Sequence, residues 1–255
     1  MISNTKLKEL SGYKQQKRCA EEGVFVVEGV KMCGEILAAK LPVKYICGTK
    51  WWLSQQSFLP ADAEVIEVDG AALERLSGMK SPNEVWMLVP RLKDGTGSGA
   101  AGRGNVTLAL DHLQDPGNMG TILRTADWFG VREVVCSPDS ASCYNPKVVQ
   151  SSMGSLLRTH IAYCALPAWL AHCGKPVVGA LLDGESIWSP DHRLALPAEG
   201  AVLVIGNESK GISAEVQQYV TRRVAIPNIG GTAESLNAAV ACAILLAEMF
   251  GHSKK

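Results

Sequence analysis

Short apolar segments in the second half of the chain constrain its fold more than any other feature. They have four to six residues, are as a group rich in valine, isoleucine and leucine, and lack the polar alternation of a strand that faces water on one side. This composition is typical of strands buried on both faces of a parallel sheet. The segments predicted as strands are 106–110, 133–136, 161–164, 177–182, 201–205 and 223–226.

Helical patterns lie between these segments. They cover residues 122–129, 147–157 and 214–219, and the longest and most apolar covers 236–250. Alternation of buried strands with helices predicts a doubly wound α/β domain with a parallel sheet.

The first part of the chain, up to about residue 92, predicts a smaller α/β unit. Its expected helices are 5–22, 30–39 and 71–76, and its expected strands are 24–28, 43–47, 63–68 and 85–89. Trp51 and Trp52 could stack on nucleic-acid bases, although adjacent tryptophans more often have at least one ring in the core.

A glycine-rich stretch, residues 93–104, separates the two parts and predicts a flexible linker between a domain at 1–92 and a domain at 105–255. Residues 97–102 match the dinucleotide fingerprint GxGxxG. That fingerprint needs a strand before it and a helix after it, whereas a strand is expected directly after it here. The alternative hypothesis of an NAD-linked oxidoreductase has only these glycines as its support.

The formal net charge of zero is an average of two unlike regions. Residues 1–50 hold nine basic and five acidic residues, and the rest of the chain holds sixteen and twenty. Most of the early excess comes from five side chains before Cys19, namely Lys6, Lys8, Lys14, Lys17 and Arg18. Such a cluster is equally consistent with contact to nucleic-acid phosphates and with a solvated helix face.

The eight cysteines contain no CxxC pair, which indicates free thiols in a reducing compartment. No apolar run approaches the roughly 20 residues of a membrane span, and residues 1–18 lack the apolar core of a secretory signal. We therefore expect a cytoplasmic protein without membrane association.

Three loops after predicted strands are rich in glycine, asparagine and proline. They are residues 115–120, 206–211 and 227–232, the last followed by 235–237. Ligands of open α/β sheets bind beyond the carboxyl ends of strands, so the loops together predict a site. Each loop alone could equally be a turn or a helix cap.

The residue types in these loops exclude several chemistries. There is no zinc-ligand spacing, no GxSxG elbow and no Walker loop, and we expect no metal. His112 is the nearest histidine, and a lone histidine on a strand is more often structural. One arginine, one glutamate and several asparagines suit a heterocycle held by backbone groups and a ribose or phosphate placed by arginine.

The three loops resemble, in order, the motifs of the SpoU (TrmH-like) branch of the SPOUT methyltransferases. Residues 118–124 match NxGxxxR, residues 205–208 with Gly211 match the second motif, and 226–227 with 235–237 match the third. The stretch 145–154 also resembles a family segment.

Residues 1–92 resemble the L30e-like RNA-binding domain that precedes the catalytic domain in rRNA ribose methylases. This match depends on residues 4–10 and 25–29. Asn83-Glu84 stands where a Gln-Gly pair is common, which is a departure from the family pattern.

The resemblance implies transfer of a methyl group from S-adenosylmethionine to a ribose 2′-hydroxyl of RNA, with 23S-type rRNA favoured over tRNA. It also implies a deep trefoil knot near the C-terminus and a homodimer formed through the C-terminal domain. Alternatives are a tRNA 2′-O-methyltransferase and a non-catalytic RNA-binding or ribosome-assembly factor.

The resemblance also implies roles for individual residues. Arg124 would be the catalytic arginine, Asn118 would position the same groups, and Glu208 would pair with and orient Arg124. The positions implied to contact or shape the cofactor loops are Gly206, Asn207, Ile226, Ser235, Leu236 and Asn237.

Overall fold

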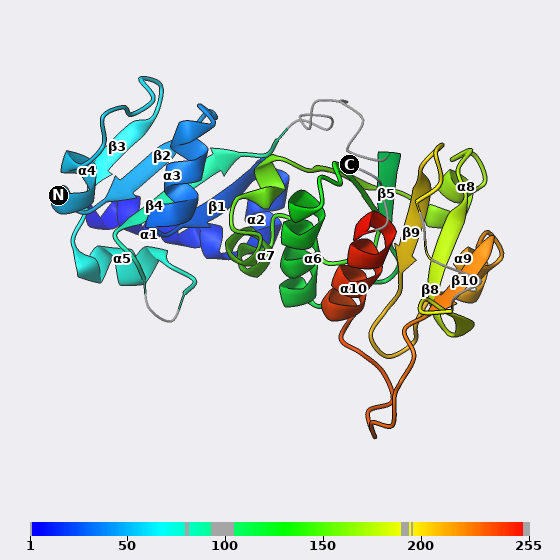
Figure 1. The fold of residues 1–255 in the computed structure, drawn as a ribbon. Coiled ribbons are helices and arrows are strands. Elements are labelled where there is room, and N and C mark those ends of the chain that lie inside the picture. The colour runs from blue at the N-terminus through cyan, green and yellow to red at the C-terminus, as the bar shows by residue number, and fades with distance from the viewer. Residues whose placement is uncertain (1, 80–81, 93–104, 190–193, 195, 252–255) are drawn as a thin grey trace. The chain divides into compact units, whose positions relative to one another are not determined.

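The computed structural model describes residues 2–79, 82–92, 105–189, 194 and 196–251. The predicted linker at 93–104, with its GxGxxG match, lies outside these residues. Contacts divide the chain into two compact units, Met1–Lys93 with Tyr144–Gly154, and Asp94–Cys143 with Ser155–Lys255 (Figure 1).

The sheet of the first unit has the order β1-β4-β2-β3. Its strands are β1 (Val24–Glu28), β2 (Tyr45–Gly48), β3 (Glu64–Glu67) and β4 (Val85–Pro90). β4 pairs antiparallel with β1 and with β2, and β2 pairs parallel with β3. The four strands predicted for this part are confirmed, with ends that differ by up to two residues.

The helices of the first unit are mostly short. They are α1 (Asn4–Ser11), α2 (Gln16–Glu21), α3 (Val30–Ala38), α4 (Lys50–Ser54) and α5 (Gly70–Leu76). The expected single helix over 5–22 is wrong, because a 3₁₀ turn, η1 (Gly12–Lys14), interrupts it. At this break Tyr13 turns into the core and its hydroxyl donates to Glu22 Oε2 at 2.6 Å.

The two adjacent tryptophans are divided between core and surface, as the sequence predicted. Trp52 is 2% exposed and Trp51 is 59% exposed. Their helix α4 was not predicted, and it begins where the Thr49 hydroxyl accepts the Trp52 N–H.

Residues 144–154 lie in the second half of the sequence but pack as part of the first unit. Their helix α7 (Pro146–Ser151) packs against β1. The Tyr144 ring lies 5.0 Å from that of Phe25, and the Arg91 guanidinium lies 4.8 Å from its centroid. The expected helix over 147–157 is wrong, because Met153 and Gly154, both with positive φ, end it before a separate 3₁₀ turn, η3 (Ser155–Leu157).

The second unit contains a six-stranded sheet of order β10-β8-β9-β5-β6-β7, in which every pairing is parallel. The strands are β5 (Val106–Leu110), β6 (Glu133–Cys136), β7 (His160–Tyr163), β8 (Val177–Ser186), β9 (Ala201–Ile205) and β10 (Arg222–Ala225). All residues of β5 and β9 are buried, as expected when helices cover both faces. The predicted parallel α/β sheet is confirmed.

Four α-helices in the described part of the second unit accompany this sheet. They are α6 (Pro116–Trp128), α8 (Leu166–Leu170), α9 (Ala214–Gln217) and α10 (Ala238–Gly251). α8 and α9 pack on the face formed by Ala109, Val202 and Val204, and α6 packs against α10 (Figure 1). Phe129 and Phe250 stack at the ends of that pair, with ring centroids 5.8 Å apart.

Two predicted helix starts are wrong by a few residues. α6 begins at Pro116 rather than at 122, because Asp115 caps it by accepting the Asn118 N–H and proline is well tolerated in a first turn. α10 begins at Ala238 rather than at 236, because the Asn237 side chain accepts the N–H groups of Ala239 and Val240. In the described part of the chain, no helix is long and apolar enough to cross a membrane.

Candidate active site

The two central strands of the second sheet bring two of the candidate loops together. Leu110 of β5 is in register with Ile205 of β9, so the chains that follow both strands leave the sheet side by side. The Asp111 N–H donates to the Ile205 carbonyl at 2.9 Å, and the buried Asp111 carboxylate accepts the Ser213 N–H at 2.7 Å. These hydrogen bonds fix the positions of the loop after β5 and the loop after β9 relative to each other at the carboxyl end of the sheet.

Asn118, in the first turn of α6, joins three segments that are distant in the sequence. Its Nδ2 donates to Glu208 Oε1 at 2.6 Å, and its Oδ1 accepts from Asn237 Nδ2 at 2.9 Å. One side chain thus connects α6 with the loop after β9 and with the start of α10. The structure brings together one residue from each of the three motifs.

The loop after β9 is closed by its own hydrogen bonds. Asn207 and Gly211 exchange backbone hydrogen bonds, and the Asn207 side chain accepts from the N–H groups of Ser209 and Lys210. A Cβ on Gly206 would lie 2.3 Å from the Gly211 carbonyl carbon. Only glycine fits at position 206, so this close backbone approach depends on it.

The segment between β10 and α10 presents mainly backbone groups, and Glu234 is its one charged side chain. Among the described residues, none from 227 to 236 makes a backbone–backbone hydrogen bond, and the Asn228 side chain bonds within the segment to Gly231 and Ala233. Leu236 is 46% exposed and Ser235 is exposed, while Ile226 is half-buried. Backbone N–H and C=O groups that have no backbone partner among the described residues, beside apolar side chains, suit an uncharged heterocycle.

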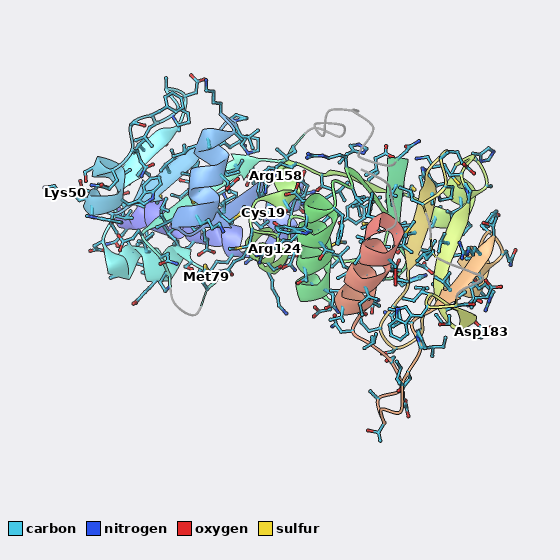
Figure 2. The ribbon with its side chains drawn as sticks, in the orientation of Figure 1. Cys19, Lys50, Met79, Arg124, Arg158 and Asp183 are labelled. Carbon is cyan, nitrogen blue, oxygen red and sulfur yellow. The ribbon has the colours of Figure 1, made fainter. Side chains whose placement is uncertain are left out.

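Arg124 lies apart from the cluster around Asn118. It is exposed on α6 (Figure 2) and makes no hydrogen bond or ion pair with any described residue. Six residues of α-helix place it about 9 Å along the axis from Asn118 and about 120° around it. The predicted pairing of Glu208 with Arg124 is therefore wrong within one chain, and Glu208 holds the Asn118 amide instead.

A histidine between two aspartates borders the loop after β9 and was not predicted as a site residue. His112 has φ +53°, its Nδ1 is hydrogen-bonded to Asp139 Oδ2, and its Nε2 lies 3.5 Å from Asp111 Oδ1. Its carbonyl accepts from Asn207 Nδ2 at 2.9 Å. Burial alone would raise the pKa of Asp139, but hydrogen bonds from Ser137 and His112 outweigh burial and lower it.

No short motif marks this arrangement in the sequence. Only the position of Asp111 and His112 at the end of a buried strand could have suggested it.

The basic cluster near the N-terminus is only partly available for an external partner. The Lys6 Nζ donates to the Tyr45 hydroxyl, which raises the lysine pKa, and it lies 3.5 Å from carboxylate oxygens of Glu9 and Glu64. Arg18 donates to Glu22 at 2.8 Å, and this bond raises the arginine pKa.

The other three side chains of the cluster face solvent. Lys8 and Lys14 are exposed, and Lys17 is exposed beside Glu21 at 4.0 Å. These three are the members of the cluster best placed to meet phosphates.

Two family models match the chain. The SpoU rRNA Methylase family matches residues 105–247, and the MRM3-like substrate binding domain matches residues 4–86. The first match includes all three loops described above.

Proteins of similar length resemble the whole chain. The 23S rRNA (guanosine(2553)-2′-O)-methyltransferase RlmP of Bacillus subtilis is 27% identical, and the alignment covers 97% of each chain. An uncharacterized tRNA/rRNA methyltransferase of Synechocystis is 29% identical, with 96% of this chain and 90% of that protein covered.

Solved structures resemble both units. A putative RNA methyltransferase of the TrmH family from Porphyromonas gingivalis is 40% identical, with a TM-score of 0.83 over 97% of this chain and 98% of that one. An AdoMet-bound rRNA methyltransferase from Sinorhizobium meliloti is 25% identical, with a TM-score of 0.85 over 100% and 97% of the two chains.

Proposed function

The chain belongs to the SpoU rRNA methylase family, and we propose that it transfers a methyl group from S-adenosylmethionine to a ribose 2′-hydroxyl of 23S-type rRNA. The observation that carries the proposal is the pair of hydrogen bonds through which Asn118 joins Glu208 and Asn237. They assemble the three motifs of the family at one end of a parallel sheet. The name of the Bacillus subtilis relative supports 23S rRNA as the substrate.

The residues present fit S-adenosylmethionine. The adenine and ribose would be held by backbone groups of the loop after β9, at Gly206 and Asn207, and of the segment from Ile226 to Leu236. Ser235 and Asn237 would shape the end of that segment. When bound, the cofactor supplies the methyl group as a sulfonium, which needs alignment rather than a strong acid.

Arg124 is the residue that we assign to the 2′-hydroxyl. An arginine guanidinium stays protonated in proteins, so it acts as a fixed cation rather than as a proton acceptor. A cation beside the ribose stabilises the negative charge that develops on the 2′-oxygen and can also hold the adjacent phosphate. Asn118, fixed by Glu208, would position the same ribose.

The separation of Arg124 from Asn118 supports a homodimer in which the arginine reaches the partner's site. Trp128, four residues further on the same helix, is 85% exposed, and Val240 on α10 is 48% exposed. Residues four apart share a helix face, so Arg124 and Trp128 lie on one surface that a second copy would cover. The C-terminal chain, from Ile226 through α10, would form the trefoil knot of the family.

The first unit would bind the RNA, with Lys8, Lys14 and Lys17 contacting phosphates. All eight cysteines are free thiols, which is consistent with the cytoplasm, where we place the protein.

The test is a map of 2′-O-methyl sites in rRNA and tRNA from a strain that lacks the protein, beside calorimetric titration of the purified chain with S-adenosylmethionine. We expect one missing site in 23S-type rRNA, restored by the wild-type gene, and saturable cofactor binding. Loss of a tRNA site instead would assign the activity to tRNA. Unchanged maps with tight RNA binding and no cofactor binding would identify a non-catalytic assembly factor.

A further inference from the structure

The first unit contains a cavity that neither the catalytic loops nor the basic cluster use. Its volume is about 450 Å³, and the described residues that line it all belong to that unit. Ligand sites for small molecules have volumes of about 300–1,000 Å³. The cavity therefore has room for one nucleobase with part of its ribose.

One carboxylate lines this cavity in a fixed orientation. Glu28, at the end of β1, accepts the Gly78 N–H on Oε1 at 3.0 Å and the Ser77 hydroxyl on Oε2. A carboxylate has about four lone-pair sites, and these bonds use two of them. No other donor among the described residues bonds to Glu28, so an acceptor site remains on each oxygen and both oxygens are held in place.

The remaining lining combines apolar surface with polar side chains. Met79 and Pro146 are half-buried, and Val26 is buried. Lys147 and Gln150 of α7 are exposed and also line the cavity. Apolar side chains can pack on the faces of a base, while a lysine and an amide can contact its carbonyl or a neighbouring phosphate.

We infer that this cavity binds an unpaired guanine of the RNA substrate, with the guanine N1–H and 2-amino group donating to Glu28. Guanine is the one common RNA base with two adjacent donors on its Watson–Crick edge, which matches two parallel acceptors. Adenine and cytosine offer one donor beside an acceptor, and uracil offers one between two carbonyls. The inference rests on the proposed RNA substrate and adds a second contact point away from the three motif loops.

The test is fluorescence anisotropy of the full chain with labelled RNA heptamers. The probes are U7 and two variants with guanine or inosine at the central position; inosine lacks the 2-amino group. One bidentate contact is worth about 1–3 kcal/mol, so we expect the guanine heptamer to bind about 5- to 150-fold tighter than U7. Inosine should give an intermediate affinity.

Two variants locate the effect. Glu28→Gln should abolish the preference for guanine, and Gln150→Trp should abolish it by filling the mouth without changing the Ser77–Glu28–Gly78 contacts. Lys50→Ala on α4 removes an exposed lysine that does not line the cavity, and it should keep the preference. Figure 2 labels both Lys50 and Met79.

Equal affinity for the three heptamers, or a preference that survives Gln150→Trp, would overturn the inference. Tighter binding of guanosine monophosphate than of the heptamer would also overturn it, in favour of a free nucleotide. Methyl transfer to rRNA by the wild type, measured in parallel, separates the two proposals. Transfer without guanine preference refutes only the cavity, and guanine preference without transfer refutes only the methyltransferase.

Discussion

Replacing Asn118 by alanine tests whether one side chain holds the three motif loops together. The substitution removes a bond to the Glu208 carboxylate at 2.6 Å and a bond from Asn237 at 2.9 Å. A hydrogen bond to a charged group contributes about 1.5–3 kcal/mol and a neutral one about 0.5–1.5 kcal/mol. The second bond is exposed to water, so we expect the free energy of unfolding to fall by about 2 kcal/mol.

A double-mutant cycle isolates the bond between Asn118 and Glu208. Urea unfolding of the wild type, Asn118→Ala, Glu208→Ala and the double variant should give a coupling free energy of about 1–2 kcal/mol, because the two side chains are in direct contact. The melting temperature of Asn118→Ala should fall by about 4–8 °C at roughly 2–4 °C per kcal/mol. Additivity within about 0.3 kcal/mol would refute the reasoning, since independent sites add within that margin.

Three further predictions concern other parts of the second unit and the thiols. Gly206→Ala should cost about 1–3 kcal/mol and weaken binding of S-adenosylmethionine by calorimetry, because the added Cβ meets the Gly211 backbone. The matched control is Gly34→Ala on α3 of the first unit, where a Cβ meets no atom within 4 Å, and it should leave the affinity unchanged. Asp139 has a lowered pKa, so its carboxylate stabilises the fold above the unfolded pKa of about 3.9, and this contribution is lost as the pH falls below that value. Asp139→Asn should therefore reduce the difference in urea midpoint between pH 6 and pH 3. An unchanged difference would contradict the role given to this carboxylate. Burial raises the pKa values of Cys47 and Cys242 to about 12. Iodoacetamide at pH 8, followed by mass spectrometry, should therefore show that the half-buried Cys173 is labelled before either of them. Equal labelling of the three thiols would show that the core opens.

The sheet of the second unit was predictable because its strands are buried on both faces. The mainly apolar segments 106–110 and 201–205 lack the alternation of a half-exposed strand, and both strands have these bounds in the structure. Helix ends were less predictable, since they depend on single side chains. Asp115 starts α6 six residues early, and no apolar periodicity reports a cap.

The residues of the motifs were predictable as a group, but their pairing was not. The motif NxGxxxR places Asn118 and Arg124 six residues apart, but the prediction put Asn118 in a loop. In the structure both lie on α6, and the helical rotation between them separates their side chains. The Glu208 carboxylate therefore contacts the Asn118 amide in the structure and not Arg124. The His112–Asp139 contact joins two different strand ends, which no local pattern connects.

The position of residues 144–154 shows a further limit of sequence patterns. Their apolar periodicity predicts a helix but not the sheet on which it packs. The contacts that decide this are the tertiary ones of Tyr144 with Phe25 and Arg91.

Transfer of tritium from labelled S-adenosylmethionine into 23S rRNA, followed by alkaline hydrolysis, tests the central proposal most directly. Alkali cleaves RNA through a free 2′-hydroxyl, so a 2′-O-methyl group leaves an alkali-resistant dinucleotide. We predict that the wild type places its label in such dinucleotides, and that Arg124→Ala binds the cofactor with wild-type affinity but transfers at least about 100-fold more slowly, as expected for loss of a charge-stabilising group. Label in mononucleotides, or full activity in Arg124→Ala, would contradict a ribose methyltransferase that depends on Arg124.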